Sequence, residues 1–259
     1  MAAPASVLAI DIGATSIKMA DVSADGVIVS SIRKRSTPYP CTPTRLVEWL
    51  ATRITDRDLD CVGIGFPGEF RDGVVHGSGN LARVAGAGTP VDPGIAAAWR
   101  GFPLTEKLIS ATGRNVVVVN DARMAALGSV RGEGTELVIT LGTGFGIALV
   151  REGDVVEIDD FGQQRMANGQ TYDEALGEGA RAENQQQWEF AVRQAVHFFA
   201  GQWRVDAVHL GGGNAQRLRP GALLGPDFTV TIQGNRAPLR GAARLFRSES
   251  DDFGVGLSR

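Results

Sequence analysis

The chain has 259 residues, and 26 lysines and arginines against 29 aspartates and glutamates give it a formal net charge of −3. This length suits one large domain or two lobes. The lack of a basic excess excludes the electrostatic signature of a protein that binds nucleic acid or anionic membrane surfaces.

Buried strands and amphipathic helices alternate in the first half of the chain, which predicts an α/β fold. The expected strands are Val7–Ile12, Ser16–Val22, Val27–Arg33, Asp60–Phe66 and Val116–Val119, and the expected helices are Thr42–Ile54 and Pro103–Thr112. Asp25-Gly26 predicts a hairpin turn, and the run of four valines predicts a strand buried on both faces. Residues 67–101 are rich in glycine and proline, so we expect a long functional loop there.

The second half repeats this alternation. The expected strands are Glu136–Leu141, Ile147–Arg151, Ala207–Leu210 and Asp227–Ile232, and the expected helices are Thr171–Gly177, Gln185–Trp203 and Gly241–Phe246. Residues 153–170 are expected to form a loop.

Two segments resemble each other, IDIGAT (Ile10–Thr15) and ITLGTG (Ile139–Gly144). Each is a buried strand followed by a small polar turn and a second strand, and they lie in the two halves of the chain. The echo predicts a duplicated α/β lobe. We expect lobes of residues 1–119 and 120–259, hinged near residue 119, with two phosphate clamps facing each other across an interlobe cleft.

Asn120 and Asp121 stand where the valine strand ends and a helical run, Ala122–Leu127, begins. Chemistry in α/β proteins is concentrated at the carboxyl ends of strands, where a carboxylate can accept a proton from a substrate hydroxyl. Asp121 is therefore a candidate general base. The alternative is that Asp121 only caps the helix, and this stretch alone does not separate the two roles.

Turns built from glycine and threonine offer backbone N–H groups and hydroxyls to a phosphate without steric cost. The candidate positions are Gly13, Thr15, Gly142, Thr143 and Gly144. Singly each turn suits a structural role, whereas the matched pair favours phosphate binding. A carboxylate beside such a turn is repelled by phosphate unless a cation lies between them, so Asp11 predicts Mg²⁺, bound directly or through water.

Two further features allow two interpretations each. Lys18 can face the same phosphate or be solvated, and we favour the solvated state. Gly211, Gly212 and Gly213 follow a strand and precede an expected helix, which suits a helix N-terminus under a nucleotide or phosphate chain. A sharp strand-to-helix turn explains these glycines equally well.

Other motifs are set aside. Gly63, Gly65 and Gly68 spell G-x-G-x-x-G, but Pro67 and the lack of a following helix remove the dinucleotide-binding context. No P-loop motif is present, and the histidines (His76, His197 and His209) suggest no catalytic triad. Cys41 and Cys61 lack metal-ligand spacing, so we expect no zinc. No signal-peptide pattern or bilayer-spanning run is found, so we expect a cytoplasmic protein.

Four motifs in this order resemble the ROK family of sugar kinases: DIGATSIK (Asp11–Lys18), NDA (Asn120–Ala122), TLGTGFG (Thr140–Gly146) and LGGGN (Leu210–Asn214). STPYPCTP (Ser36–Pro43) resembles the polyphosphate-glucokinase branch. The resemblance implies a two-lobed actin-like ATPase (ribonuclease H-like) fold and a kinase that uses ATP or inorganic polyphosphate.

The resemblance also implies roles by position. Asp121 is expected to be the catalytic base, and Asn80 and Asn120 are expected to bind sugar hydroxyls, with Gly68 on the sugar-side loop. The phosphate and nucleotide positions are Asp11, Gly13, Ala14, Thr15, Lys18, Thr140, Gly142, Thr143, Gly144, Gly211, Gly212, Gly213 and Asn214.

The chain departs from the family at its sugar-binding E-x-G-H segment. Asp160 and Gln163 stand in place of the glutamate and histidine, and a glutamine can bind a hydroxyl but cannot change its charge. Ala14 replaces a common glycine, and the family's cysteine-rich zinc motif is missing.

The predicted function is transfer of a phosphoryl group to a hydroxyl of a hexose or sugar-like substrate. The Gln163 departure keeps open a cyclitol or modified-sugar kinase, and also a weakened sugar-binding or regulatory protein. A ROK repressor is disfavoured because only six residues precede Val7 and no basic patch exists. The sequence does not decide the oligomeric state, for which a homodimer is one candidate.

Overall fold

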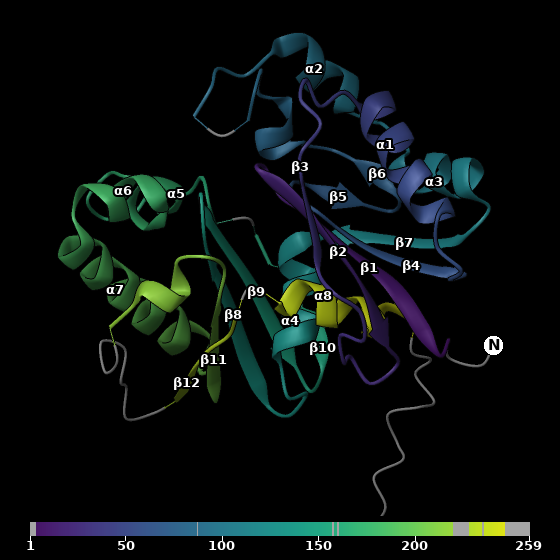
Figure 1. Cartoon of the computed structure of the whole chain (residues 1–259). Coiled ribbons are helices and arrows are strands. Elements are labelled where there is room, and N and C mark those ends of the chain that lie inside the picture. The colour runs from purple at the N-terminus through teal and green to yellow at the C-terminus, as the bar shows by residue number, and fades with distance from the viewer. Residues whose placement is uncertain are drawn as a thin grey trace, which may run out of the picture. The chain divides into compact units, whose positions relative to one another are not determined.

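Two α/β units make up the chain in the computed structural model, which describes residues 4–86, 88–156, 158–159, 161–219, 228–234 and 236–246 (Figure 1). The first unit runs to Asp121 and includes the segment from Leu239 onward, and the second unit is Ala122–Pro238. The division after Asp121 lies two residues beyond the predicted hinge. The return of the C-terminal segment to the first unit differs from the predicted lobe of residues 120–259.

The first unit is built on a five-stranded sheet with the order β3-β2-β1-β4-β7. The strands are β1 (Ser6–Ile12), β2 (Ser16–Ser23), β3 (Arg33–Ser36), β4 (Cys61–Phe66) and β7 (Asn115–Asn120). Strands β1, β2 and β3 form an antiparallel meander, whereas β1, β4 and β7 are parallel. The parallel strands place their carboxyl ends on one edge of the sheet.

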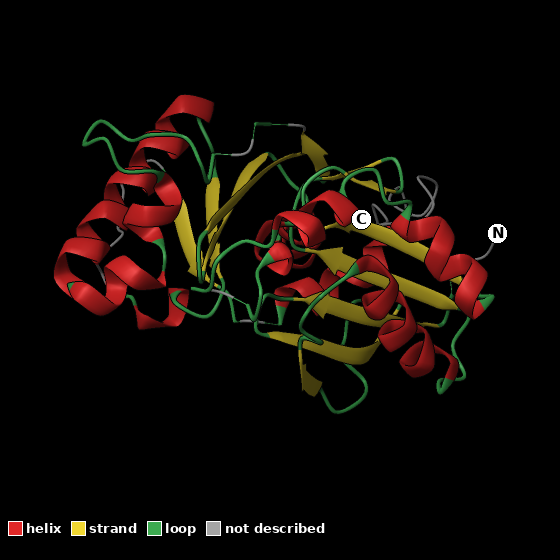
Figure 2. Cartoon of the chain, turned by 90° about the horizontal axis from the view of Figure 1, so that it is seen from above, coloured by secondary structure: helices red, strands yellow, loops and turns green. Residues whose placement is uncertain are grey.

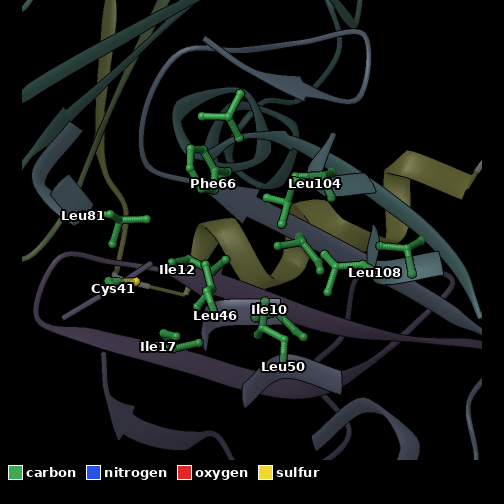
Figure 3. Close-up of a cluster of buried hydrophobic side chains, with 14 of the residues drawn as sticks. Ile10, Ile12, Ile17, Cys41, Leu46, Leu50, Phe66, Leu81, Leu104 and Leu108 are labelled. Atoms are coloured by element: carbon green, nitrogen blue, oxygen red, sulfur yellow. The ribbon is translucent and has the colours of Figure 1, made fainter. Parts of the chain in front are cut away.

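Three helices cover one face of this sheet: α1 (Pro43–Thr55), α2 (Pro93–Trp99) and α3 (Leu104–Thr112). Alternate residues of the strands point into the core beneath them, as the period of two in a strand requires. Figure 3 shows this core, which includes Ile10, Ile12, Ile17, Leu46, Leu50, Phe66, Leu104 and Leu108. Thr42 caps α1 by accepting a hydrogen bond from the Arg45 N–H at 3.4 Å.

The opposite face packs against the 3₁₀ helix η3 (Ala242–Phe246), which directly follows the helix α8 (Ala237–Gly241). A Cβ atom on Gly63 would lie 2.8 Å from the Cβ of Ala242. Gly63, which belongs to the G-x-G-x-x-G sequence that was set aside, therefore permits a close approach between β4 and η3.

The second unit has a five-stranded sheet with the order β10-β9-β8-β11-β12. Its strands are β8 (Thr135–Leu141), β9 (Phe145–Arg151), β10 (Asp154–Val156), β11 (Ala207–Gly211) and β12 (Thr229–Ile232). Its helices are α4 (Asp121–Ser129, with Asp121 in the first unit), α5 (Tyr172–Leu176), α6 (Glu178–Glu183) and α7 (Gln185–Trp203), with the 3₁₀ helix η2 (Ala215–Arg217). Figure 2 shows the helices of each unit in red beside its yellow strands.

The two sheets have the same plan, which confirms the predicted duplication. In each, an antiparallel meander is followed by two strands that run parallel to its first strand. The cores also correspond, since α7 packs on one face of the second sheet through residues such as Val192, Val196 and Phe199. The predicted interlobe cleft stays a prediction.

Several predicted elements are wrong in detail. The strand expected at Val27–Arg33 is reduced to a single bridge between Val22 and Ile28, and the third strand is β3. All four β3 residues are exposed and polar, so no apolar pattern indicated the strand. In β7, Val116 and Val118 are buried whereas Val117 and Val119 are only partly so, because successive side chains of a strand point to opposite faces of the sheet. The prediction that β7 is buried on both faces is therefore wrong for the face of Val117 and Val119.

The expected loop at residues 67–101 contains β5 (Phe70–Arg71), β6 (Val74–Val75), the 3₁₀ helix η1 (Gly79–Ala82) and α2. Similarly, β10 lies in the loop expected at residues 153–170, and α6 was not predicted. Strands of two or three residues and a helix of six are too short to show a period. Among the described residues, no helix has both the length and the apolar character needed to cross a bilayer.

Candidate functional site

The carboxyl edge of the first sheet gathers the candidate residues of the first unit. Asp11 of β1 is in register with Gly65 of β4, which is in register with Val119 of β7. The three strands therefore end at a similar level. The turn after β1 carries Gly13–Thr15, the loop after β4 carries Gly68, and β7 passes directly into α4 at Asn120-Asp121.

The Gly13–Thr15 turn is held by side chains from the STPYPCTP segment. The buried Thr37 hydroxyl donates to the Gly13 carbonyl at 2.7 Å, and the Thr37 N–H donates to the Thr15 carbonyl at 3.2 Å. The Gly13 N–H donates to the Ser16 carbonyl at 3.1 Å, which closes the turn. The turn is thus fixed before any ligand arrives.

Tyr39 connects this turn to the segment that carries Asn80. Its hydroxyl lies within hydrogen-bond distance of two acceptors, the Ala14 carbonyl at 2.8 Å and the Asn80 carbonyl at 3.2 Å. Burial, with a smaller contribution from Cys41, raises the pKa of Tyr39 to about 12, so the hydroxyl remains a donor at neutral pH. Sequence reasoning noticed the STPYPCTP segment but did not assign this function to Tyr39.

Lys18 forms an ion pair with Asp11, with Nζ 3.0 Å from Oδ2. The expectation that Lys18 is only solvated is therefore wrong, because its side chain is 22% exposed and bound to a carboxylate that is 13% exposed. The facing positions of Asp11 and Lys18 in the antiparallel β1–β2 pair explain the contact. A lysine ammonium is thus one cation beside Asp11, and the predicted Mg²⁺ stays a prediction.

Gly68 and Asn120 are joined by a hydrogen bond from Asn120 Nδ2 to the Gly68 carbonyl at 2.8 Å. Gly68 has a φ of +155°, and a Cβ there would lie 2.3 Å from the Gly77 carbonyl oxygen. Only glycine fits this position, which brings the loop after β4 against the backbone just before Asn80. The Asn80 side-chain oxygen accepts from Arg83 Nε at 2.7 Å.

Asp121 is the first residue of α4, directly beyond the edge strand β7, and is partly buried. A carboxylate in the first turn of a helix is stabilised by the helix dipole, so a structural contribution is compatible with this position. Its neighbours along the sheet edge are the glycine turns described above. The position therefore also suits a base that meets a substrate hydroxyl.

The carboxyl edge of the second sheet gathers the other candidates. Thr140 of β8 is in register with Gly211 of β11, so the Gly142–Gly144 turn and the Gly211–Asn214 turn leave neighbouring parallel strands. The Asn214 side chain donates to the Gly142 carbonyl at 2.9 Å, and its N–H donates to the Leu141 carbonyl at 3.0 Å. The two turns thus form one connected backbone surface.

Gly212 is required by this connection. Its φ is +86°, and a Cβ would lie 2.2 Å from the Leu141 carbonyl oxygen. The segment that follows is the three-residue 3₁₀ helix η2, so a short helix does follow these glycines, and their role under a nucleotide stays a prediction. The sharp-turn alternative explains Gly212, while Gly213 has no atom within 4 Å of its Cβ position.

Asp173 is a site residue that the sequence reasoning missed. Its Oδ1 accepts from the Phe145 N–H at 2.7 Å, directly after the Gly142–Gly144 turn, and its Oδ2 accepts from Gln163 Nε2 at 2.7 Å. Asp173 therefore ties the segment of Gln163 to the Gly142–Gly144 turn. No local sequence signal indicated it, because its two partners lie 28 and 10 positions away along the chain.

A second carboxylate, Glu178, lies near the same turns. A hydrogen bond from Arg181, supported by one from Asn214, lowers the pKa of Glu178, and the Glu178–Arg181 ion pair measures 2.5 Å. Thr143 is exposed at the tip of its turn. Gln163 is also exposed. Asp160 lies outside the described residues.

The donor set fits a magnesium ion that arrives with phosphate. Within the described part of the chain, no cluster of three or more His, Cys, Asp or Glu side chains could hold a metal by itself. Mg²⁺ in phosphoryl-transfer sites is usually held by one or two carboxylates together with substrate phosphates and waters. The single carboxylate of Asp11 matches this mode.

The histidines and cysteines include two buried side chains, His209 and Cys41. His209 is buried on β11 and paired with Glu136, with Nε2 2.6 Å from Oε2, which supports a structural role. His76 is exposed in the segment that precedes η1. Cys41 and Cys61 are free thiols.

Known proteins share both the sequence pattern and the fold. The profile of the ROK family matches residues 7–157. A glucokinase of Halalkalibacterium halodurans is 32% identical over 162 residues, which are 57% of this chain and 44% of that protein. The chain thus spans less than half the length of that relative.

Two further similarities cover most of the chain. A polyphosphate glucokinase of Mycobacterium tuberculosis is 24% identical over 246 residues, which are 90% of this chain and 84% of that protein. The crystal structure of an inorganic polyphosphate/ATP-glucomannokinase from Arthrobacter sp. strain KM has a TM-score of 0.77 at 26% identity, covering 93% of this chain and 98% of that one.

Proposed function

Because the chain belongs to the ROK family, we propose that it is a sugar kinase that transfers a phosphoryl group from ATP or inorganic polyphosphate to a hydroxyl of a hexose or sugar-like substrate. The observation that carries the proposal is the carboxyl edge of the first sheet. There the register of three parallel strands brings three features to the same edge of the sheet: Asn120-Asp121, the Gly68 loop that Asn120 contacts, and the Gly13–Thr15 turn.

Asp121 takes the proton of the attacking hydroxyl in this proposal. A positioned carboxylate contributes a factor of about 10²–10⁴ to such a step. Asn120 and Asn80 orient the sugar. The Gly68 loop stands between them, and its glycine-only geometry keeps the sugar-side backbone in a fixed position.

The glycine turns bind phosphate through backbone N–H groups and through the hydroxyls of Thr15 and Thr143. Asp11 would hold Mg²⁺ at the donor's phosphates, and the ion would neutralise charge that develops during transfer. Lys18 supplies a second positive charge to the same carboxylate and limits its repulsion of phosphate. Phosphoryl transfer needs mainly such positioning and charge neutralisation.

In this proposal, Gln163 determines which acceptor substrate the protein prefers. One N–H of its amide donates to Asp173, so its side-chain oxygen and its second N–H are left for a substrate hydroxyl. A glutamine in place of histidine favours a modified sugar or a cyclitol as the second candidate acceptor. Gln163→His should raise the rate with glucose relative to other acceptors, and unchanged rates with every acceptor would exclude Gln163 from the sugar site.

The deciding experiment measures transfer by wild-type protein and Asp121→Asn, with ATP and polyphosphate crossed against hexoses, amino sugars and cyclitols. We expect the variant to lose a factor of about 10²–10⁴ in kcat while its circular dichroism melt stays close to that of wild type. Glu106→Gln is the matched control, because Glu106 is likewise an acid in the first turn of a helix. Turnover of Asp121→Asn within threefold of wild type contradicts the role of Asp121.

The same experiment separates a kinase from a sugar-binding regulator. If a sugar binds in calorimetry but no donor supports transfer by the wild-type protein, the regulatory alternative replaces the proposal.

A further inference from the structure

We propose that a pocket lined by four arginines on the first unit is a separate binding site for phosphate groups. The pocket lies between the edge strand β3 and the C-terminal half of α1 and has a volume of about 250 Å³. Its lining consists of Leu8, Met19, Arg33, Arg35, Thr52, Arg53, Asp56 and Arg57. None of these residues belongs to the proposed catalytic site.

The strand pairing explains why the arginines converge. Arg33 is in register with Met19, and Arg35 is in register with Ile17, so both arginines project from the β3 face that continues the α1-covered face of the sheet. Arg53 lies in the last turn of α1, and Arg57 follows the helix, directly after its C-cap Asp56. The strand β3 and the C-terminal end of α1 with the turn after it thus present two guanidinium groups each.

The local charge is positive although the chain as a whole carries −3. Four arginines against Asp56 give the lining 4 − 1 = +3, and Asp21, which pairs with Arg57 at 3.1 Å, reduces the balance to +2. The C-terminal end of α1 also disfavours an anion, because its carbonyl groups carry partial negative charge. The positive charge of the four guanidinium groups outweighs the two carboxylates and the helix end together.

Three of the guanidinium groups are already oriented, among them that of Arg35, whose Nη1 donates to the Lys34 carbonyl at 2.9 Å. Arg53 donates to the Trp49 carbonyl at 2.8 Å, and its guanidinium carbon lies 3.6 Å from the centre of the Trp49 ring. Arg57 is held by Asp21. Each guanidinium has five N–H donors, so these contacts leave donors for a ligand, and less side-chain entropy is lost on binding.

The size and chemistry of the pocket favour phosphate. Arginine matches the paired oxygens of a phosphate through bidentate hydrogen bonds. The volume is below the 300–1,000 Å³ or so that is usual for pockets that hold drug-sized ligands, so a compact oxyanion fits better than a whole nucleotide. The phosphate can come from a free phosphate ion or from units of a polyphosphate chain.

The test is calorimetric titration of the full chain with inorganic phosphate, tripolyphosphate and long-chain polyphosphate. We compare wild-type protein with Arg33→Ala/Arg35→Ala, whose positions are exposed on β3, so that the fold should survive. Lys34→Ala is the matched control, since Lys34 is an exposed cation on the same strand with its side chain on the other face. A thermal melt of each variant verifies folding.

We expect the double variant to lose one binding event or to bind at least tenfold more weakly, and Lys34→Ala to stay within twofold of wild type. A loss seen with inorganic phosphate assigns the site to single phosphate groups, whereas a loss seen only with the longer anions assigns it to the chain. Equal binding of all three ligands by wild type and double variant overturns the proposal. Because binding is measured without turnover, absence of kinase activity would refute the proposed function and leave this result intact.

Discussion

Glu136→Gln is the most informative single change for stability, because it removes one charge from a fully enclosed network. Glu136 is 1% exposed and accepts three hydrogen bonds, from the Arg131 N–H at 3.0 Å, the Gly132 N–H at 2.7 Å and His209 Nε2 at 2.6 Å. The two N–H groups lie just beyond the end of α4. The network therefore anchors the loop after α4 to β8 and β11.

The magnitude follows from these contacts. Hydrogen bonds to a charged acceptor contribute about 1.5–3 kcal/mol each, and removing one partner of a buried pair costs about 3–5 kcal/mol. The glutamine keeps one acceptor oxygen but turns an NH₂ group toward another donor. We expect a loss of about 3 kcal/mol, or a fall in Tm of about 6–12 °C at the 2–4 °C per kcal/mol usual for chains of about this size.

The pH dependence gives a second measurement. Burial raises the pKa of Glu136, but the hydrogen bonds from Arg131, Gly132 and His209 outweigh it, so the net pKa is lowered. A lowered pKa means that ionised Glu136 stabilises the fold above its ordinary pKa of about 4.3. That contribution is lost as the pH falls through the depressed value. The stabilities of variant and wild type should therefore converge in acid.

Urea and thermal unfolding from neutral pH into the acid range measure both effects. Glu133→Gln, an exposed acid in the same loop, is the control and should change stability by less than about 0.5 kcal/mol. A Glu136→Gln melt that matches wild type, or a stability difference that does not narrow with falling pH, refutes the reasoning.

Three further outcomes are expected. Gly212→Ala should destabilise the fold by about 1–3 kcal/mol in urea, because Gly212 has a φ of +86° and a carbonyl oxygen 2.2 Å from its Cβ position. Gly213→Ala has neither feature and should be near neutral. Equal unfolding midpoints of the two variants would contradict this prediction. Tyr39→Phe should cost about 1 kcal/mol and raise the KM for sugar, since the hydroxyl bridges the Ala14 and Asn80 segments of the proposed site. An unchanged KM would show that Tyr39 does not support the sugar site. A thiol reagent near pH 8 should label the partly exposed Cys61 and spare Cys41, whose pKa burial raises to about 12; rapid labelling of both would show that Cys41 is accessible.

The strand framework was predictable because apolar residues reveal it. Ile10, Ile139 and their neighbours form runs that are long enough to mark strands, and the repeated turn after each run indicated the duplication. By contrast, β3 consists of four exposed polar residues and is held by backbone hydrogen bonds to β2. Backbone pairing at a sheet edge has no required side-chain pattern, so sequence reasoning placed this strand too early.

The site was predictable where backbone geometry restricts the residue type. The glycines at 68 and 212 stand where no other residue fits, and both lie in segments that the sequence marked. Tyr39 and Asp173 were missed because they act through contacts between distant segments. The Tyr39 hydroxyl reaches Ala14 and Asn80, 25 and 41 positions away, and no local spacing records such contacts.

The way the chain crosses between its units matters for protein engineering. The second unit occupies one continuous stretch, Ala122–Pro238, whereas the first unit also includes the described residues Leu239–Phe246, whose 3₁₀ helix η3 packs on one face of its sheet. A gene fragment for the second unit can therefore be cut out directly. A fragment for the first unit requires a circularly permuted design or a flexible tether that joins Asp121 to Leu239, and a truncation at Asp121 alone would expose apolar surface and promote aggregation.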